Sequence, residues 1–216
     1  FSLSVAKKGT VKLVDRGQKI LRDEGVVEFL IRTLQFVRER LEIAVVGTVA
    51  KRNSPLNYHG VEVPVSMDVF DNKIRHAFAT GSYESEEREL IEKHISGSYD
   101  VVDLGASTGF STTYALNRLQ ENVRAVAVEA NPEMIDVLEE MKSVNDVEFS
   151  VEPSAYSPTS SEVKFYTHEK TVSGSMERES GTEVVVPAIS LSEIIEKYDL
   201  REFVCLVDIE GSELSL

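Results

Sequence analysis

The stretch from Tyr99 to Phe110 constrains the fold more than any other part of the chain, because it predicts a strand, a glycine turn and a helix in succession. A short apolar run ends at Asp103, Gly105 and Gly109 follow, and residues 111–119 have the composition of a helix. Glycine lets the backbone turn tightly and approach a ligand. The N-terminus of the next helix offers unpaired N–H groups to polar ligand atoms. The sequence therefore predicts the first part of a β-α-β unit, with a ligand-binding loop between strand and helix.

The spacing of the acid and the two glycines indicates which ligand the loop suits. A dinucleotide-binding fold would show G-x-G-x-x-G, whereas this chain has D-x-G-x-x-x-G, with the acid at the end of the strand. A carboxylate attracts a ligand that carries an ammonium and a sulfonium, and it repels a pyrophosphate. The pattern resembles motif I of the class I S-adenosylmethionine-dependent methyltransferases. A glycine turn in some other α/β protein is the alternative that this stretch alone leaves open.

A second motif follows at the distance that one helix and one strand occupy. The apolar run over residues 123–128 ends at Glu129, which comes 20 residues after Gly109. Asn131-Pro132 then predicts a helix N-cap with proline in the first turn. A carboxylate at the end of the second strand can accept two hydrogen bonds from a ribose diol. An exposed acid at a strand end is the alternative, but two motifs at matching positions favour a cofactor site.

Further patterns predict the rest of an α/β domain. Continuous apolar runs predict buried strands, and apolar residues at spacings of three and four predict helices. Before the glycine loop, the expected elements are a helix over residues 25–41, a linker over 51–58, an edge strand over 61–65, a second strand or turn over 67–78, and a helix capped by Ser85 and stopped by Gly97. After the two motifs, strands are expected over 147–151, 163–166 and 184–186. A helix to Tyr198 then starts with the capping box Ser190–Glu193, and a buried strand follows over 203–207. A long polar loop over 167–182 contains His168.

Composition limits the functions that are open to the chain. The 216 residues carry a net charge of −14, and they divide into a basic segment, residues 1–55, with 11 Lys+Arg and 6 Asp+Glu, and an acidic domain, residues 56–216. An acidic domain repels phosphates, so nucleic acid is not expected as a substrate or partner. Such a surface is typical of proteins from a high-salt cytoplasm and equally of an ordinary acidic protein.

The single cysteine, Cys205, lies in an apolar run and is expected to be a buried thiol. No apolar run reaches the length of a membrane span. We expect a cytoplasmic protein, with a membrane-peripheral location as the alternative.

Four pieces of sequence together resemble the FkbM family of class I methyltransferases, from about Tyr58 to the end of the chain. They are G-S-Y-E-S-E-E at 81–87, V-V-D-L-G-A-S-T-G at 101–109, V-E-A-N-P at 128–132 and D-I-E-G-S-E at 208–213. The resemblance implies a Rossmann-like α/β fold, a mostly parallel sheet flanked by helices. It also implies S-adenosyl-L-methionine as cofactor and O-methylation of a hydroxyl on a sugar, a glycan or a small natural product. Leu206 departs from the family, which usually has a lysine at that position.

The resemblance implies the site residues as well. The residues expected to bind the cofactor are Tyr83, Glu84, Asp103, Gly105, Ala106, Ser107, Thr108, Gly109, Glu129, Ala130, Asn131, Glu152, Ser154, Ala155 and Asp208. Tyr83 and Glu84 are expected to close over the methionine end of the cofactor, with packing as the alternative for Tyr83. Asp208 is the first candidate for the general base that takes the hydroxyl proton, Glu210 is the second, and His168 is a more distant one. The alternative for Asp208 and Glu210 is a pair of acids that ties down loops by hydrogen bonds.

Several other interpretations stay open at this stage. No group of Cys and His has the spacing of metal ligands, so no metal is expected, although a divalent ion at Asp208 and Glu210 is an alternative. The departure at Leu206 favours a non-catalytic S-adenosylmethionine-binding or scaffold protein. A nicotinamide-dependent Rossmann enzyme is the third possibility, and the missing G-x-G-x-x-G argues against it.

Two regions outside the motifs carry expectations of their own. The helix over 25–41 has an apolar stripe with arginines off the stripe, which predicts contact with an anionic membrane surface, with a second subunit or with the protein itself. Residues 203–207 are apolar on both faces, which predicts a central strand with a neighbour on each side. We therefore expect the natural chain to continue beyond Leu216 with further strands.

Overall fold

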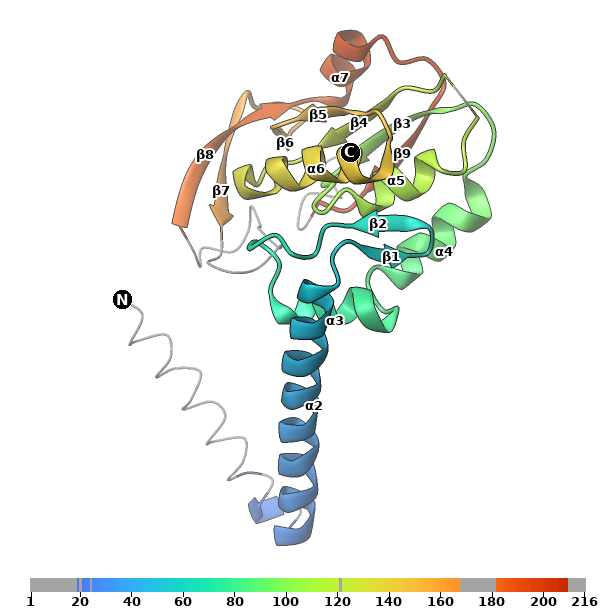
Figure 1. Ribbon diagram of the computed structural model, residues 1–216. Coiled ribbons are helices and arrows are strands. Elements are labelled where there is room, and N and C mark those ends of the chain that lie inside the picture. The colour runs from blue at the N-terminus through green and yellow to red at the C-terminus, as the bar shows by residue number, and fades with distance from the viewer. Residues whose placement is uncertain (1–18, 20, 24, 121, 168–181, 210–216) are drawn as a thin grey trace. The chain divides into compact units, whose positions relative to one another are not determined.

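The structure is a computed structural model, and the residues that it describes are 19, 21–23, 25–120, 122–167 and 182–209 (Figure 1). The chain divides into two compact units, Phe1–Val45 and Val46–Leu216. The predicted elements after residue 56 all lie in the second unit, which contains the sheet. Among the described residues, no helix combines the length and the apolar character that a membrane crossing requires.

The helix α2, Val26–Arg52, confirms the helix expected over 25–41 and extends it to Arg52. No proline interrupts the sequence before Pro55, so nothing in the chain forces an earlier end. Gly47 lies where the helix approaches the chain that follows it. A Cβ atom at Gly47 would lie 2.6 Å from the carbonyl oxygen of Asn72, so a larger residue would push these segments apart.

The main sheet has four parallel strands in the order β5-β4-β3-β9. These strands are β3, Asp100–Leu104; β4, Ala125–Val128; β5, Ser150–Glu152; and β9, Phe203–Val207. The order corresponds to strands 3-2-1-4 of a Rossmann sheet, in which ligands bind at the carboxyl ends of the strands. The register places Asp103 opposite Ala127 on one side and Leu206 on the other. The expected α/β, Rossmann-like fold is therefore confirmed, with an N-terminal helix before it.

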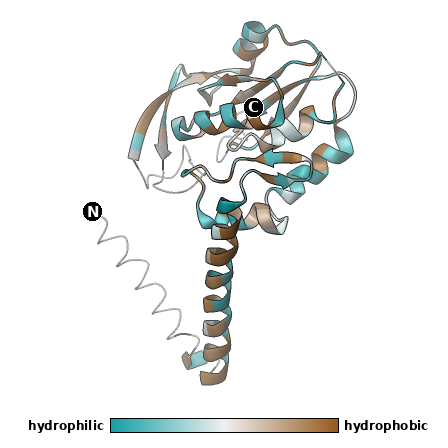
Figure 2. Cartoon of the chain, in the orientation of Figure 1, coloured by the Kyte–Doolittle hydropathy of each residue, from teal (hydrophilic) through white to brown (hydrophobic). Residues whose placement is uncertain are grey.

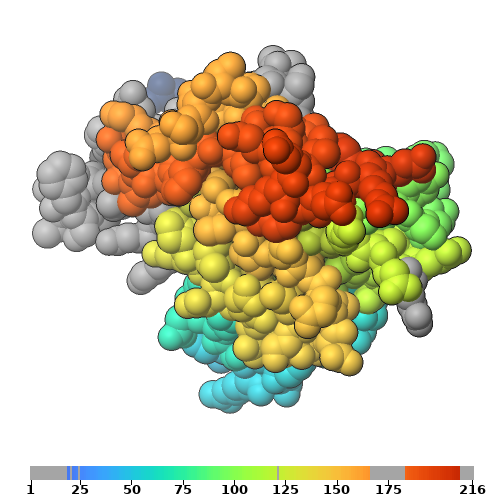
Figure 3. All heavy atoms as spheres, turned by 90° about the horizontal axis from the view of Figure 1, so that it is seen from above, coloured from blue at the N-terminus to red at the C-terminus, as the bar shows by residue number. Residues whose placement is uncertain are grey.

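The two faces of the sheet are covered by different elements (Figure 1). The helices α5, Phe110–Leu116, and α6, Pro132–Asn145, lie on one face together with the hairpin of β1, Leu56–Tyr58, and β2, Val61–Val63. The helix α7, Leu191–Tyr198, lies on the opposite face and forms part of the red surface in Figure 3. Each face of the sheet is therefore closed by helices, as a parallel sheet requires.

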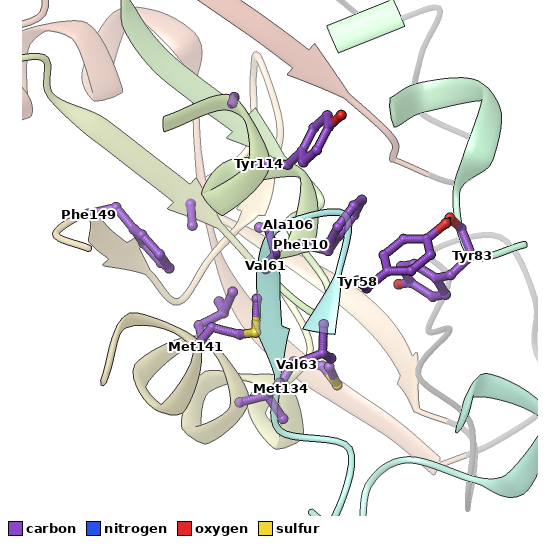
Figure 4. Packing of buried hydrophobic residues seen from close by; sticks show 14 of the residues in the cluster. Tyr58, Val61, Val63, Tyr83, Ala106, Phe110, Tyr114, Met134, Met141 and Phe149 are labelled. Atoms are coloured by element: carbon purple, nitrogen blue, oxygen red, sulfur yellow. The ribbon is translucent and has the colours of Figure 1, made fainter. Parts of the chain in front are cut away.

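Alternate side chains of the strands point into two hydrophobic cores, because successive residues of a strand face opposite sides. Val101 and Ala127 pack in the core with α5, α6 and the hairpin, which Figure 4 shows from close by. Val102 and Val128 pack in the core beneath α7. The unbroken apolar runs of β3 and β4 thus reflect burial on both sides.

Two expectations for the segment before the sheet were wrong. Residues 67–78, predicted to be a strand or turn, lead into the helix α3, Asn72–Thr80, because Asp71 caps it: its side chain accepts a hydrogen bond from the N–H of Ile74 at 2.9 Å. The helix α4, Ser85–His94, begins at Ser85 and is not capped by it. The N-cap is Glu84, whose φ of 40° lies in the left-handed region, and it makes no side-chain cap hydrogen bond.

The strands outside the main sheet agree with the sequence in part. In the sheet of order β6-β8-β7, the strands β7, Glu162–Thr167, and β8, Thr182–Ile189, confirm and lengthen those expected over 163–166 and 184–186, whereas β6, Ala155–Tyr156, was not expected. The linker expected over 51–58 is wrong at both ends, because α2 continues to Arg52 and Leu56–Tyr58 forms β1, which pairs with β2. The capping box of α7 is confirmed, since the Ser190 N–H donates to Glu193 at 2.8 Å and the Glu193 N–H donates to Ser190 at 3.3 Å. Residues 168–181, which include His168, lie outside the described residues.

β9 lies at the edge of the described sheet. Among the described strands it pairs only with β3, and the second neighbour that was expected for it stays a prediction. Val204 and Leu206 pack against one core, and Phe203 and Cys205 pack against the other. These four residues are only partly buried, and Val207 is 37% exposed. Cys205 is half-buried, less than expected, and burial raises the pKa of its thiol to about 11.

Candidate functional site

The glycine loop between β3 and α5 is held against the ends of two other strands. Gly105 and Gly109 have left-handed φ angles of 88° and 76°. The N–H groups of Gly105 and Ala106 donate to the carbonyl of Val128 at 2.9 and 3.0 Å, which ties the loop to the end of β4. A Cβ atom at Gly105 would lie 2.1 Å from the carbonyl oxygen of Asp208. Glycine is thus required at this position, because the loop touches the backbone that follows β9.

Glu129 lies beneath the same loop, at the end of β4. One oxygen of its carboxylate accepts the N–H of Ser107 at 2.7 Å, and the other accepts the N–H of Asn131 at 2.6 Å. The residue is 7% exposed, and burial raises its pKa even though hydrogen bonds from the backbone act in the opposite direction. A carboxylate has about four lone-pair sites, so about two are left for a ligand such as a diol.

Asp103, at the end of β3, is a buried acid that holds the first turn of α5. It is 2% exposed, and it accepts a hydrogen bond from the Thr112 hydroxyl at 2.5 Å, which joins β3 to α5. Burial raises its pKa to about 7, and the nearby charges of Glu87, Glu129 and Asp208 add to the effect. This carboxylate therefore supports the loop from below.

Three carboxylates meet beside the loop, and we refer to Glu84, Glu87 and Asp208 as the acid cluster. One carboxylate oxygen from each residue lies within 4.8 Å of those from the other two. Burial raises the pKa of Glu84 to about 8, and the charges of its acidic neighbours contribute to the rise. The pKa of Glu87 is also raised, by burial first and then by Asp208. Like charges at this separation disfavour full ionisation, so the acid cluster retains a proton near neutral pH and favours a cationic ligand.

The acid cluster opens into a hollow of about 790 Å³ between α4 and β9. The hollow has acids at one end and apolar side chains along its walls, including Leu90, Ile91, Val204 and Leu206. No lysine or arginine is found among the described residues that line it. Leu206 stands where the resemblance leads us to expect a lysine, so an apolar side chain replaces a cation in the wall of the hollow.

Tyr83 lies in the aromatic core and touches the glycine loop with its hydroxyl (Figure 4). Its ring stacks on Phe78 with 3.9 Å between centroids, and its oxygen is 3.3 Å from the Thr108 hydroxyl. The Tyr58 hydroxyl donates to the Tyr83 carbonyl at 2.7 Å. Burial raises the pKa of Tyr83 well above its usual value. Of the two roles considered for Tyr83, the structure shows packing, and the side chain braces the loop from the core side.

Glu152, at the end of β5, is engaged by α7. Its carboxylate accepts hydrogen bonds from Lys197 at 2.5 Å, from the Tyr198 hydroxyl at 2.7 Å and from the Ser154 hydroxyl at 2.8 Å. Burial acts to raise the pKa of Glu152, but these hydrogen bonds outweigh it, so that its pKa is lowered. The sequence did not indicate that Lys197 and Tyr198 would occupy this acid.

The predicted residues fall into two groups. The larger group lies around the glycine loop at the ends of β3, β4 and β9, and it contains Tyr83, Glu84, Asp103, Gly105, Ala106, Ser107, Thr108, Gly109, Glu129, Ala130, Asn131 and Asp208. The smaller group, Glu152, Ser154 and Ala155, lies at the end of β5. Glu210 lies outside the described residues.

Sequence reasoning missed three residues of the larger group. Glu87 lies three residues after Glu84, a spacing that places two side chains on the same side of a helix, so this signal was present. Ser111, which donates to Glu84 at 3.3 Å, and Thr112 lie in the first turn of α5 and were missed because they were assigned only to a helix.

The fold and the site define a class, a Rossmann-like α/β protein with a ligand loop at the carboxyl ends of its parallel strands. The family model described as Methyltransferase FkbM domain matches residues 103–216. That match spans more than half of the 216 residues, and the chain therefore belongs to the FkbM methyltransferase family.

Other comparisons gave distant matches or none. A search among curated proteins found no match. Similar solved structures include the YcgJ protein of Bacillus subtilis, with 20% identity and a TM-score of 0.29, over 32% of this chain and 30% of that one. A Pyrococcus horikoshii protein provisionally described as a transferase has 20% identity and a TM-score of 0.32, over 44% and 33%. Another P. horikoshii protein, provisionally described as an RNA methyltransferase, has 29% identity and a TM-score of 0.28, over 33% and 35%. The chain thus spans about a third of the length of each.

Proposed function

We propose that the chain is an S-adenosylmethionine-dependent methyltransferase that methylates a hydroxyl group on a sugar, a glycan or a small natural product. The observation that carries the proposal is the placement of Glu129. It lies under the glycine loop, two backbone N–H groups fix its orientation, and lone pairs of its carboxylate are left for a ligand. The experiment that tests the proposal is transfer of a labelled methyl group to an acceptor.

The residues present fit the cofactor. Glu129 suits the two ribose hydroxyls, since a carboxylate accepts two hydrogen bonds from a diol. The acid cluster lies on the other side of the loop and suits the ammonium of the methionine part, because its carboxylates attract a cation and no lysine or arginine is found among the described residues that line the hollow. Gly105 keeps the loop free of side-chain atoms where it meets the backbone of Asp208. When bound, the cofactor supplies an electrophilic methyl group on a sulfonium.

The protein's own contribution to the reaction is orientation and proton transfer. Holding the acceptor oxygen in line with the methyl group accounts for most of the acceleration in such reactions. Asp208 is the exposed member of the acid cluster, at the end of β9, and it is placed to take the hydroxyl proton as general base. Glu84 is less suited to that role, because with a pKa of about 8 it holds its proton near neutral pH.

A non-catalytic S-adenosylmethionine-binding or scaffold protein is the second candidate, and one observation favours it. Leu206 is half-buried against the core where the family resemblance leads us to expect a lysine. If that lysine orients the acceptor or the base, this chain binds the cofactor without transferring its methyl group. The two candidates share the cofactor site and differ in turnover.

Turnover with methyl-labelled cofactor separates the two candidates. We would incubate the protein with labelled cofactor and a panel of oligosaccharides, glycolipids and hydroxylated small molecules. Methyltransferase function predicts label in one acceptor class, and Asp208→Asn lowers kcat on that acceptor by about 10²-fold or more, a larger effect than its effect on cofactor affinity. Glu139→Gln, an exposed acid on α6, is the matched control and leaves turnover unchanged. Cofactor binding with no transfer across the panel would favour the scaffold.

A further inference from the structure

The first twenty residues of α2 expose a continuous set of apolar side chains, and we refer to this set as the seam. Its members are Val26, Val27, Leu30, Ile31, Leu34, Val37, Leu41 and Val45. Each is between 43% and 72% exposed, and all lie in the first unit of the chain. Figure 2 shows the predominance of hydrophobic residues along this helix. An exposed apolar surface of this size marks a place where another molecule binds.

The spacing of the seam indicates the shape of that molecule. The centre of the seam runs through Val27, Leu30, Leu34, Val37 and Leu41, at alternating intervals of three and four residues. This is the 3.5-residue repeat with which one helix packs along another in a coiled coil. The remaining members flank this line on both sides. A second helix, lying along α2, therefore fits the seam.

Charge argues for a protein partner and against a lipid surface. Residues 26–45 contain three arginines and three glutamates, so this part of the helix has no net charge. Helices that lie on anionic membranes carry an excess of Lys and Arg on their polar side. Arg38 lies four residues after Leu34 and three before Leu41, and is exposed beside the seam. At a helix–helix contact this guanidinium stays in water at the rim while its stem covers apolar surface.

We propose that the seam is the contact surface for a second copy of this chain. The same apolar line serves both partners in a symmetric dimer, so no further surface is needed. A buried Val, Leu or Ile covers about 60–120 Å², so the half-exposed side chains of two seams supply about 700 Å² of apolar area. Because apolar atoms form about 65% of a homodimer interface, the total surface area buried in the dimer is about 1,100 Å². That area is at the low end for specific interfaces and gives a reversible dimer.

The mass of the full chain in solution, measured by sedimentation equilibrium, tests this proposal. The expected mass rises from 24.0 kDa toward twice that value as the concentration increases from about 1 to about 200 µM. Leu34→Glu places a charge in the seam and raises the dissociation constant by at least about tenfold, and Leu41→Glu does the same at a second position. Phe36→Glu is the matched control, because Phe36 is also exposed, at 42%, but lies two residues from Leu34 on the other side of the helix.

Three results would overturn the proposal. The first is a wild-type chain that stays at 24.0 kDa at every concentration. The second is a loss of dimer in Phe36→Glu equal to that in Leu34→Glu, which would indicate a general effect of charge on the helix. The third is a monomer that binds vesicles of phosphatidylglycerol and loses that binding in Leu34→Glu, which would assign the seam to a membrane. Circular dichroism of each variant verifies that α2 is still formed.

Discussion

The contact between the glycine loop and the end of β9 predicts the effect of one substitution in detail. Gly105→Ala adds a Cβ atom that would lie 2.1 Å from the carbonyl oxygen and 2.9 Å from the carbonyl carbon of Asp208. Both neighbours are backbone atoms, so the chain after β9 must move. The movement strains the hydrogen bond from the Asp208 N–H to the Leu104 carbonyl, which is 2.9 Å long. In addition, the φ of 88° costs a residue with a side chain about 1–2 kcal/mol.

The free energy of unfolding should therefore fall by about 3–4 kcal/mol in Gly105→Ala, of which about half comes from the lost contact and hydrogen bond. Gly81→Ala is the matched control, because Gly81 has a φ of 83° and no atom lies within 4 Å of its virtual Cβ. This control is expected to lose about 1–2 kcal/mol, the cost of φ alone.

Urea denaturation of both variants measures the two free energies under the same conditions. The account predicts that Gly105→Ala is less stable than Gly81→Ala by about 2 kcal/mol. Cofactor affinity should also fall in Gly105→Ala and stay unchanged in Gly81→Ala, since Gly81 ends α3. Equal losses of stability in the two variants would refute the close approach of the loop to Asp208.

Two further predictions concern buried acids. The folded pKa values of Glu84, about 8, and Asp103, about 7, exceed their ordinary values of 4.5 and 3.8, so the folded state holds protons that the unfolded chain loses. The free energy of unfolding should consequently fall by about 2 kcal/mol or more as the pH rises from about 5 to about 8. In a series of denaturation experiments over this pH range, Glu84→Gln should make the dependence on pH weaker. A rise in stability over that range would contradict the raised pKa values of these two acids. Thr112→Val removes the hydroxyl that donates to Asp103 and should cost about 1–3 kcal/mol of stability, whereas Thr33→Val, on the exposed surface of α2, should cost less than about 1 kcal/mol.

Local signals in the sequence were enough to predict the elements around the loop. The run ending at Asp103, the two glycines and the Asn131-Pro132 start of α6 each have a direct physical meaning in the backbone, and the structure has the strand, turn and helix that they indicate. The capping box of α7 is a local signal of the same kind. These features depend on residues a few positions apart, which a sequence displays directly.

Features that depend on contacts between distant residues could not be predicted in the same way. Lys197 and Tyr198, more than forty residues after Glu152, donate hydrogen bonds to its carboxylate, and no local signal in the sequence indicated this. The acid cluster likewise brings α4 to the end of β9, which are more than a hundred residues apart in the chain.

The prediction for the start of α3 failed for a different reason. The sequence contains a helix-capping residue there, but the residues before it were interpreted as extended chain. Asp71 is a favourable N-cap residue, and the helix it begins was missed because the preceding valines suggested an extended chain. The alternating Val61, Val63 and Val65 are all buried, but the regular strand they form ends at Val63.

Calorimetric titration with S-adenosylmethionine tests the central claim, that the glycine loop and Glu129 form a cofactor site. The account predicts binding of one cofactor per chain and no binding of NAD under the same conditions. Glu129→Ala should weaken the affinity for S-adenosylmethionine by about 2 kcal/mol, which is about 30-fold. Denaturation of that variant verifies that it is folded, because Ser107 and Asn131 lose their acceptor. Absence of binding by the wild-type chain, or unchanged affinity in a folded Glu129→Ala, would contradict the account.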